Sequence, residues 1–296
     1  MKIAVVIVTY NPIESILLDL VETIKGCVNF IFVVDNCSQK KEGLANKLSK
    51  ISTFTQLEEN KGLATAQNYG IEQAILYDAD IILFFDQDSA VDEIYVQSMV
   101  ADYASLKKKN INLGVLGPTV FDVKDKHYYK PIKINNWGKR LALVSQSQHA
   151  PIETSLVISS GCLVETKVLK DVGRMNEAYF IDYIDTEWCL RAIHKGYRNF
   201  ISQSSILKHS IGDHFISFAS FRIPIYSKNR VFFRIRNAYW LAKCTHTPWV
   251  LGMREIAKNI FYQLVLVLNS RSKWDMLKML VKANFFGIVK SGDKND

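Results

Sequence analysis

The sequence lacks the features that mark several large classes of protein. No run of about 18 apolar residues occurs, so we expect no conventional transmembrane helix. The longest candidate, residues 260–268, is nine residues long and contains Gln263. The five cysteines include no CxxC pair, which favours free thiols in a reducing cytoplasm. No signal peptide with a small-residue cleavage site is visible at the start.

Several motifs are also missing, and each absence disfavours one kind of chemistry. There is no GxGxxG after the first apolar run and no GxxxxGKS/T, which disfavours a dinucleotide cofactor or a P-loop ATPase. Without HExxH or a Cys/His cluster, the sequence gives no sign of structural zinc, and it has no GxSxG nucleophile elbow. No helix-turn-helix, RRM or KH signature is recognisable, so we expect no nucleic-acid partner.

What is present is a globular composition with an uneven distribution of charge. The 296 residues are 48% hydrophobic and 22% charged, enough to bury a sizeable core and to exclude disorder or a small disulfide scaffold. Residues 1–221 carry 23 basic and 25 acidic side chains, whereas residues 222–296 carry 14 and 4. The excess positive charge therefore lies in the last quarter, which favours attachment to something anionic there.

The first half of the chain alternates between strand and helix patterns. Apolar runs predict strands at residues 3–8, 30–34, 53–57 and 81–85, and helical spacing predicts helices at 13–25, 40–50, 62–77 and 92–109. This alternation predicts an α/β fold with a mostly parallel sheet flanked by helices. Ligands of such sheets bind beyond the carboxyl ends of the strands.

The second half is less regular. We expect strands at residues 115–121, 128–134, 156–165, 198–201 and 206–209, and a helix at 182–195 capped by Asp182. After about residue 215 the pattern changes to helices, at 225–244, 249–269 and 273–290. The last of these has an apolar stripe surrounded by lysines.

Acidic residues follow two of the predicted strands. Asp86 and Asp88 come directly after residues 81–85, and two such carboxylates suit a divalent cation beside a diphosphate. The alternative is a solvated acidic turn. Asp35 follows residues 30–34 and could accept hydrogen bonds from a nucleobase, or it could cap the following helix.

Other candidate residues each have a functional and a structural interpretation. The small residues from Gly62 onward allow a ligand, or the sheet, to approach the helix start. Asp185 is a candidate general base, whereas Glu187 could simply form an i,i+4 ion pair with Arg191. His209 could ligate a metal or be structural. The basic run of Lys228, Arg230, Arg234 and Arg236 could bind phosphate or form a solvated helix face.

In their order and spacing, these segments resemble a family-2 inverting glycosyltransferase with the GT-A fold. The resemblance rests on residues 6–12, 34–38, 60–70, 86–89, 159–161, 180–191 and 209–212. It is closest to the bacterial rhamnosyltransferase branch that builds O-antigens and related polysaccharides. That branch tends to carry Arg-x-Tyr-Tyr-x-x-Arg-Asn, and here Phe232 and Phe233 replace both tyrosines.

The resemblance implies roles for the matching positions. Asp185 would be the catalytic base, and Gly161, Glu187 and Trp188 would form the acceptor site. Asp86, Asp88 and His209 would hold Mg²⁺ or Mn²⁺. The donor nucleotide sugar would be bound by Thr9, Tyr10, Asn11, Asp35, Asn36, Gly62, Asn68, Asp86, Arg230 and Arg236.

The resemblance also implies a division of the chain and a set of partners. We expect a catalytic domain at residues 1–215, with a nucleotide-binding half to about residue 90 and an acceptor half beyond it, and a basic helical extension at 216–296. The expected reaction is transfer from dTDP-rhamnose to a polyprenyl-diphosphate-linked saccharide at the cytoplasmic face of the inner membrane. The alternatives are another donor, such as UDP-galactose or UDP-glucose, or a non-catalytic sugar-nucleotide-binding scaffold. The basic helices could dock on anionic lipid, pack on the catalytic domain or form an oligomer contact.

Overall fold

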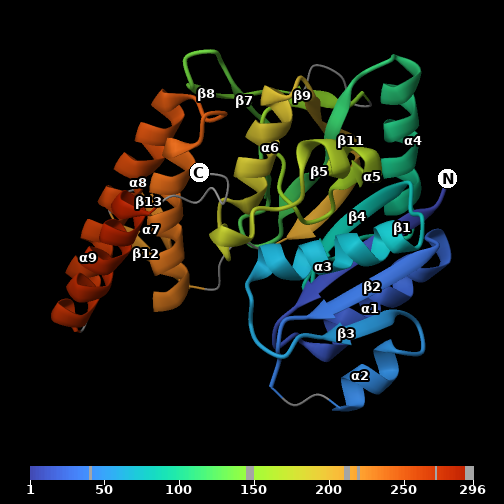
Figure 1. Cartoon of the computed structure of the whole chain (residues 1–296), viewed down its shortest axis with the longest axis horizontal. Helices are drawn as coiled ribbons and strands as arrows, with labels where there is room; N and C mark the ends of the chain where they lie inside the picture. The colour runs from blue at the N-terminus through green and yellow to red at the C-terminus, as the bar shows by residue number, and fades with distance from the viewer. Residues whose placement is uncertain (40–41, 145–149, 210–213, 219–220, 271, 291–296) are drawn as a thin grey trace.

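The first half of the chain folds as the alternation predicts. The computed structural model describes residues 1–39, 42–144, 150–209, 214–218, 221–270 and 272–290. Strands β1 (Ile3–Thr9), β2 (Phe30–Asp35), β3 (Thr53–Gln56) and β4 (Ile81–Asp86) lie parallel in the order β3-β2-β1-β4. Helices α1 (Glu14–Ile24), α2 (Glu42–Leu48), α3 (Leu63–Leu76) and α4 (Tyr95–Lys108) connect or follow them (Figure 1).

The second half extends the same sheet. Strand β10 (Leu163–Glu165) pairs antiparallel with β4 and with β5 (Leu113–Asp122), and β11 (Arg198–His209) runs parallel to β5. Strand β9 (Ile152–Thr154) closes that edge, and β6 (His127–Tyr128) pairs with β5. Strands β7 (Ile132–Ile134) and β8 (Arg140–Ala142) form a separate hairpin. Helices α5 (Thr166–Val172) and α6 (Ile184–His194) complete this half.

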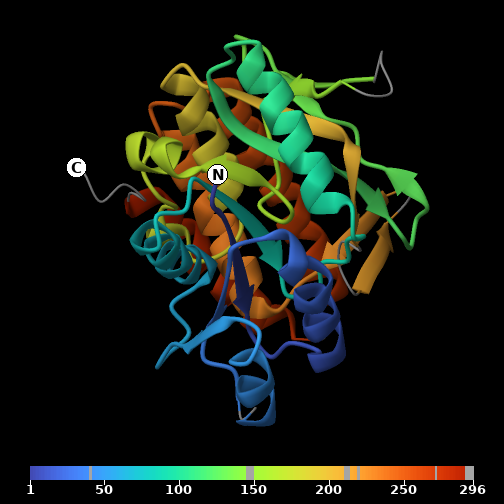
Figure 2. The same ribbon diagram turned by 90° about the vertical axis from the view of Figure 1, so that its right-hand side faces the viewer.

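The last quarter of the chain adds one hairpin and three helices. The hairpin of β12 (His214–Phe218) and β13 (Phe221–Ile225) was not expected from the sequence, where the pattern beyond residue 215 indicated helices alone. Helices α7 (Lys228–Lys243), α8 (Trp249–Asn269) and α9 (Lys273–Val289) follow as predicted. They pack together at one side of the sheet domain (Figures 1 and 2). None of the described helices combines the length and apolarity needed to span a membrane.

The strands read as continuous apolar runs because both faces of the sheet are buried. Successive residues of β1 point to opposite faces, so Val6 belongs to the core shared with α3, α5 and α6, whereas Val5 belongs to the core shared with α1 and α4. Trp240 of α7 joins the first of these cores and contacts Tyr179 edge-on. The last quarter of the chain is therefore anchored in the core that lies behind the candidate site.

Candidate active site

The parallel register brings three of the expected residues to one edge of the sheet. Thr9 pairs with Asp35 across β1 and β2, and Val8 pairs with Asp86 across β1 and β4. Thr9, Asp35 and Asp86 therefore end neighbouring strands, where ligands of parallel sheets bind. Tyr10, which follows Thr9, is half exposed at this edge.

The Asp35 carboxylate organises the loops at this edge. It accepts hydrogen bonds from Thr9 Oγ1 at 2.8 Å, Ser38 N at 2.7 Å and Ser38 Oγ at 2.6 Å, and from Gln56 Nε2 at 3.2 Å. Ser38 Oγ in turn accepts from the backbone N–H of Asn11, which has a left-handed φ of 49°. Buried carboxylates need such donors, so Asp35 fixes the shape of the loop that presents Tyr10 and Asn11.

A second set of side-chain amides joins the neighbouring loops. Asn36 Oδ1 accepts from Lys61 N at 2.9 Å, and Asn36 Nδ2 donates to Asn60 Oδ1. Gln87 Oε1 accepts from Tyr10 N at 2.7 Å, which ties the end of β1 to the end of β4. Gln87 and Asn60 were not expected site residues. Their only signal in the sequence was their position beside Asp86 and Gly62.

Two expected donor-binding residues, Gly62 and Asn68, lie in close contact with residues 175–180. Gly62 has φ +88°, and a Cβ there would lie 2.6 Å from the Phe180 ring and 2.7 Å from its carbonyl oxygen. That carbonyl accepts from Leu63 N at 2.6 Å, so protein backbone occupies the first turn of α3 where an anion was expected. The Asn68 amide donates to Met175 O at 2.9 Å and accepts from Met175 N at 3.0 Å, and its role in donor binding stays a prediction.

The two carboxylates after β4 are suited to a divalent cation that shares the diphosphate of a substrate. Asp86 is partly buried at the strand end, and Asp88 is exposed. Burial lowers the pKa of the Arg230 guanidinium, but the charge of Asp182 and its hydrogen bonds raise it, and the charge of Asp86 adds to this. Among the described residues, no three His, Cys, Asp or Glu side chains gather as a metal site. The donor set fits Mg²⁺ or Mn²⁺ because one or two carboxylates with substrate phosphates suffice for such ions.

The third expected metal ligand, His209, ends β11. A backbone bridge between Ala90 and Lys208 brings this strand end beside the segment that follows Asp88. The imidazole of His209 lies outside the part of the chain whose side chains are described. Its role as a ligand therefore stays a prediction.

Asp185 lies in the first turn of α6, in a partly apolar setting. It lines a small cavity together with Cys162, Trp188 and Cys189. Burial raises the pKa of its carboxyl group, whereas hydrogen bonds from the backbone of Thr186 and Ser159 act in the opposite direction. The Thr186 N–H lies 2.7 Å from Asp185 Oδ1. A carboxylate with a raised pKa is a better proton acceptor than a fully solvated one.

One loop links Asp185 to Asp86. The backbone of Ser159 donates to Asp185, and Ser160 Oγ lies 3.3 Å from Asp86 N. Gly161 follows with φ +76°, and a Cβ there would lie 2.2 Å from Tyr95 Oη, which donates to the Gly161 carbonyl. Gly161 therefore shapes this loop. Residues 159–160 thus contact both acidic segments.

The loop before α6 has an unusual backbone. Phe180, Asp182 and Tyr183 have left-handed φ angles of 61°, 62° and 65°. This conformation is strained in residues other than glycine, and such residues are common at functional sites. Tyr183, not Asp182, is the N-cap of α6. The expected cap was wrong because the Asp182 carboxylate instead accepts two hydrogen bonds at 3.1 Å from Arg230.

Helix α7 holds this strained loop in place. Asn237, whose side chain is fully buried, donates from Nδ2 to the carbonyls of Tyr179 at 2.7 Å, Ile181 at 2.8 Å and Asp182 at 3.1 Å. Arg236 donates to Ala178 O at 2.6 Å and lies 3.8 Å from the Trp240 ring. The Arg236 guanidinium therefore has partners inside the protein, and its expected phosphate contact stays a prediction.

The substituted phenylalanines of the α7 motif also pack inward. Phe233 stacks on Phe180, with ring centroids 4.3 Å apart, and contacts Phe232 edge-on. A hydroxyl group is not needed for this packing. The Phe233 ring therefore supports the same loop that Asn237 holds by hydrogen bonds.

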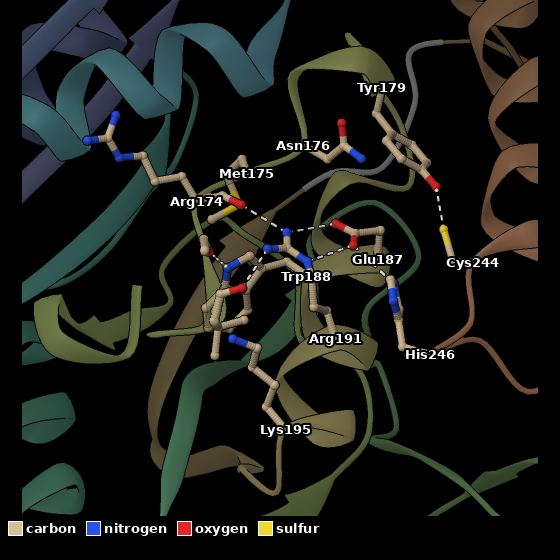
Figure 3. Close-up of polar contacts among 12 residues, drawn as sticks. Arg174, Met175, Asn176, Tyr179, Glu187, Trp188, Arg191, Lys195, Cys244 and His246 are labelled. Carbon is tan, nitrogen blue, oxygen red and sulfur yellow. Dashed lines mark hydrogen bonds and ion pairs between the residues drawn. The ribbon is translucent and has the colours of Figure 1, made fainter. Parts of the chain in front are cut away.

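Glu187 and Trp188 are both buried, and Figure 3 shows the residues around them. Glu187 is 1% exposed and forms the predicted ion pair with Arg191 at 2.8 and 2.9 Å. His246 Nε2 lies 3.0 Å from the same carboxylate. The Trp188 indole donates to Gly173 O at 2.8 Å. Both side chains thus join α6 to its neighbours, and their expected acceptor contacts stay a prediction.

The contact between Glu187 and His246 should make the stability of the fold depend on pH. We expect the free energy of unfolding to fall as the solution becomes mildly alkaline. Burial alone would lower the pKa of His246, but hydrogen bonds with Cys244 and Glu187 raise it to about 9. Because the pKa of His246 is higher in the folded than in the unfolded chain, its protonation stabilises the fold. This stabilisation is fully present below the ordinary histidine pKa near 6.5 and is lost as pH rises through about 9. We expect the free energy of unfolding to fall by roughly 1–2 kcal/mol over this range, because solvent screens the partly exposed His246. Denaturant titrations at a series of pH values measure it.

The matched variant is His246→Gln, which should flatten this part of the pH profile. His194→Gln removes an exposed histidine with its ring centroid 6.5 Å away and should keep the wild-type slope. An unchanged slope in His246→Gln would contradict the assignment.

Comparison with known proteins identifies the family to which this chain belongs. The family model described as glycosyl transferase family 2 matches residues 4–173. The chain belongs to this family. Along 289 residues, this glycosyltransferase is 34% identical to the dTDP-rhamnosyl transferase RfbF of Shigella flexneri, covering 97% of this chain and 95% of RfbF.

Solved structures show the same GT-A fold at lower identity. GalNAc-T7 with UDP, GalNAc and Mn²⁺ superposes with a TM-score of 0.61 at 16% identity, over 88% of this chain and 57% of that one. TarS 1–349 of S. aureus with UDP-GlcNAc superposes with a TM-score of 0.58 at 16% identity, over 96% and 79% of the two chains. The glycosyltransferase therefore has the predicted α/β sheet with its C-terminal helices.

Proposed function

We propose that this glycosyltransferase moves a rhamnosyl unit from dTDP-rhamnose to a hydroxyl group of a lipid-linked saccharide, with inversion at the anomeric carbon. The observation that carries the proposal is the 34% identity to a dTDP-rhamnosyl transferase over nearly the whole of both chains. The site supports the proposal because residues 159–160 form hydrogen bonds both with Asp86, at the donor edge, and with Asp185. The proposed place of action is the cytoplasmic face of the inner membrane.

In this mechanism Asp185 accepts the proton of the acceptor hydroxyl. The acceptor oxygen then bonds to the anomeric carbon while the bond from that carbon to the diphosphate oxygen breaks, and dTDP leaves. Thr186 N and the Ser159 backbone hold the carboxylate in position during this step. Mg²⁺ or Mn²⁺, held by Asp86 and Asp88, would supply electrostatic stabilisation of the diphosphate when bound.

The remaining site residues are assigned to donor binding and loop shape. We assign the nucleotide to the edge of the sheet formed by Thr9, Asp35 and Asn36. The side chain of Tyr10 is half exposed at this edge. We assign Arg230, which Asp182 holds with two hydrogen bonds at 3.1 Å, to the diphosphate. Residues 1–90 would carry most donor contacts and 91–215 the acceptor contacts, with residues 216–296 supporting the base.

Titration calorimetry with a panel of sugar nucleotides in Mg²⁺ buffer tests the donor. We expect dTDP-rhamnose to bind more tightly than UDP-galactose, UDP-glucose or UDP-GlcNAc, and Asp88→Asn to weaken binding by roughly tenfold or more as one charge-assisted ligand is lost. Asp92→Asn, which neutralises an exposed carboxylate four residues further on, is the matched control and should bind normally. Tighter binding of a UDP-sugar would replace the proposed donor.

A further inference from the structure

Helices α8 and α9 expose large apolar side chains on their outward faces. On α8 these include Trp249, which is 74% exposed, followed by Met253, Ile260, Leu264 and Leu268. Their spacing of four and seven residues places them on one side of the helix. This side is opposite to Tyr262, Val265 and Leu266, which pack in the core shared with α7. The α8 helix is therefore apolar on both sides, although only one side is covered.

Helix α9 presents a similar stripe. Trp274 is 77% exposed, and Leu277, Val281, Phe285 and Ile288 follow at spacings of three and four residues. Its buried side, with Leu280 and Ala283, packs in the same core as Val231 and Ile235 of α7. The exposed stripe of α9 is thus surplus to the packing of the three helices. We call the exposed residues of α8 and α9 together the apolar face.

Positive charge borders the apolar face. Lys278 and Lys282 follow Trp274 and Leu277 along the helix and are exposed at the edge of the stripe. Lys273 and Lys290 stand at the two ends of α9. Asp275 is the acidic residue in the first turn, so basic side chains predominate on this helix. An apolar stripe flanked by lysines is typical of helices that lie in the interface of an anionic bilayer.

Helices α8 and α9 pack on α7 at one side of the molecule, and α9 lies outermost in Figure 1.

We infer that the apolar face docks on an anionic lipid surface. Tryptophans at the two helix starts would lie at headgroup depth, where their amphipathic rings are favoured. A second copy of this chain is the rival occupant, but a symmetric contact would set the same lysines against each other. Lys273, Lys278, Lys282 and Lys290 outnumber Asp275 on and beside α9, so two such faces would repel each other, whereas anionic lipid complements them.

Flotation of the full chain with vesicles tests this inference. We expect binding to vesicles of phosphatidylglycerol and phosphatidylcholine, much weaker binding to phosphatidylcholine alone, and release by high salt. Lys278→Glu/Lys282→Glu should reduce the partition coefficient by roughly tenfold or more, since each basic residue near such a surface is worth about fivefold. Val281→Ser/Phe285→Ser should reduce the partition coefficient by a comparable factor, because less apolar surface is buried in the bilayer.

Matched controls make the same chemical changes elsewhere. Lys108→Glu/Lys109→Glu reverses two exposed lysines at the end of α4, and Leu76→Ser/Ile94→Ser removes exposed apolar groups outside the apolar face. Both should float like the wild type. Donor binding by calorimetry should be normal in all four variants, which separates this inference from the proposed reaction.

Three results would overturn the inference. The first is a wild-type chain that does not float with phosphatidylglycerol vesicles. The second is α9 variants that float as well as the controls. The third is a wild-type dimer in light scattering that both α9 variants convert to monomer, which would assign the apolar face to a second copy.

Discussion

Replacing Asp185 by Asn should reduce the turnover number by roughly 10²- to 10⁴-fold, the usual contribution of a general base. The amide has nearly the same shape and can still accept the Thr186 N–H bond at 2.7 Å, so the fold and donor binding should persist. Its oxygen cannot take a proton at neutral pH. Transfer of radiolabelled sugar, measured beside calorimetric donor binding, separates the two effects.

A matched control for this variant is Asp171→Asn, which neutralises an exposed carboxylate on α5 bonded to Tyr197. It should retain normal turnover. Turnover of Asp185→Asn within a few-fold of the wild type would remove Asp185 from the role of base. A loss of donor binding together with turnover would instead give Asp185 a part in the donor site.

Replacing Asn237 by Ala should impair both stability and turnover. The carbonyls of Tyr179, Ile181 and Asp182 would lose their buried donor, which costs about 2–4 kcal/mol of unfolding free energy. The left-handed residues that follow would then relax and shift Asp185. A displacement of about 1 Å at a catalytic group can cost roughly 100-fold in rate. Asn237 is therefore expected to act as a positioning residue.

Asn199→Ala separates positioning from stability. Asn199 is also fully buried and donates to two carbonyls, those of Ser155 and Cys189, at 3.2 Å. It should lose comparable stability while its turnover, measured well below the unfolding transition, stays within a few-fold of normal. Equal turnover in the two variants would mean that Asn237 stabilises the fold without positioning the base.

The sequence predicted the sheet well where both faces of a strand are buried. Residues 30–34 and 81–85 are continuous apolar runs and became β2 and β4. It was less informative where polar residues enter the core. Strand β11 was predicted as two strands because residues 202–205 are polar, yet Ser202 and Ser204 are satisfied by the buried carboxylate of Asp102. The strand continues through a register shift there.

The candidate site shows a similar contrast. Residues at strand ends could be placed from sequence, because the parallel register carries Thr9, Asp35 and Asp86 to one edge. Roles that depend on distant backbone could not. Arg236 resembled a phosphate ligand, but its partners are carbonyls of residues 178 and 179, far away along the chain. No spacing within a motif reports such a partner.

The hydrogen bonds from Asn237 of α7 to the loop of residues 179–182 limit where this enzyme can be truncated or fused to segments of a relative. The family model ends at residue 173, before Asp185, its loop and the asparagine that restrains that loop. A shortened chain ending near residue 215 would keep the nucleotide edge but leave the strained backbone unsupported. Exchanges of acceptor specificity between relatives should therefore transplant residues 177–194 and α7 as one unit.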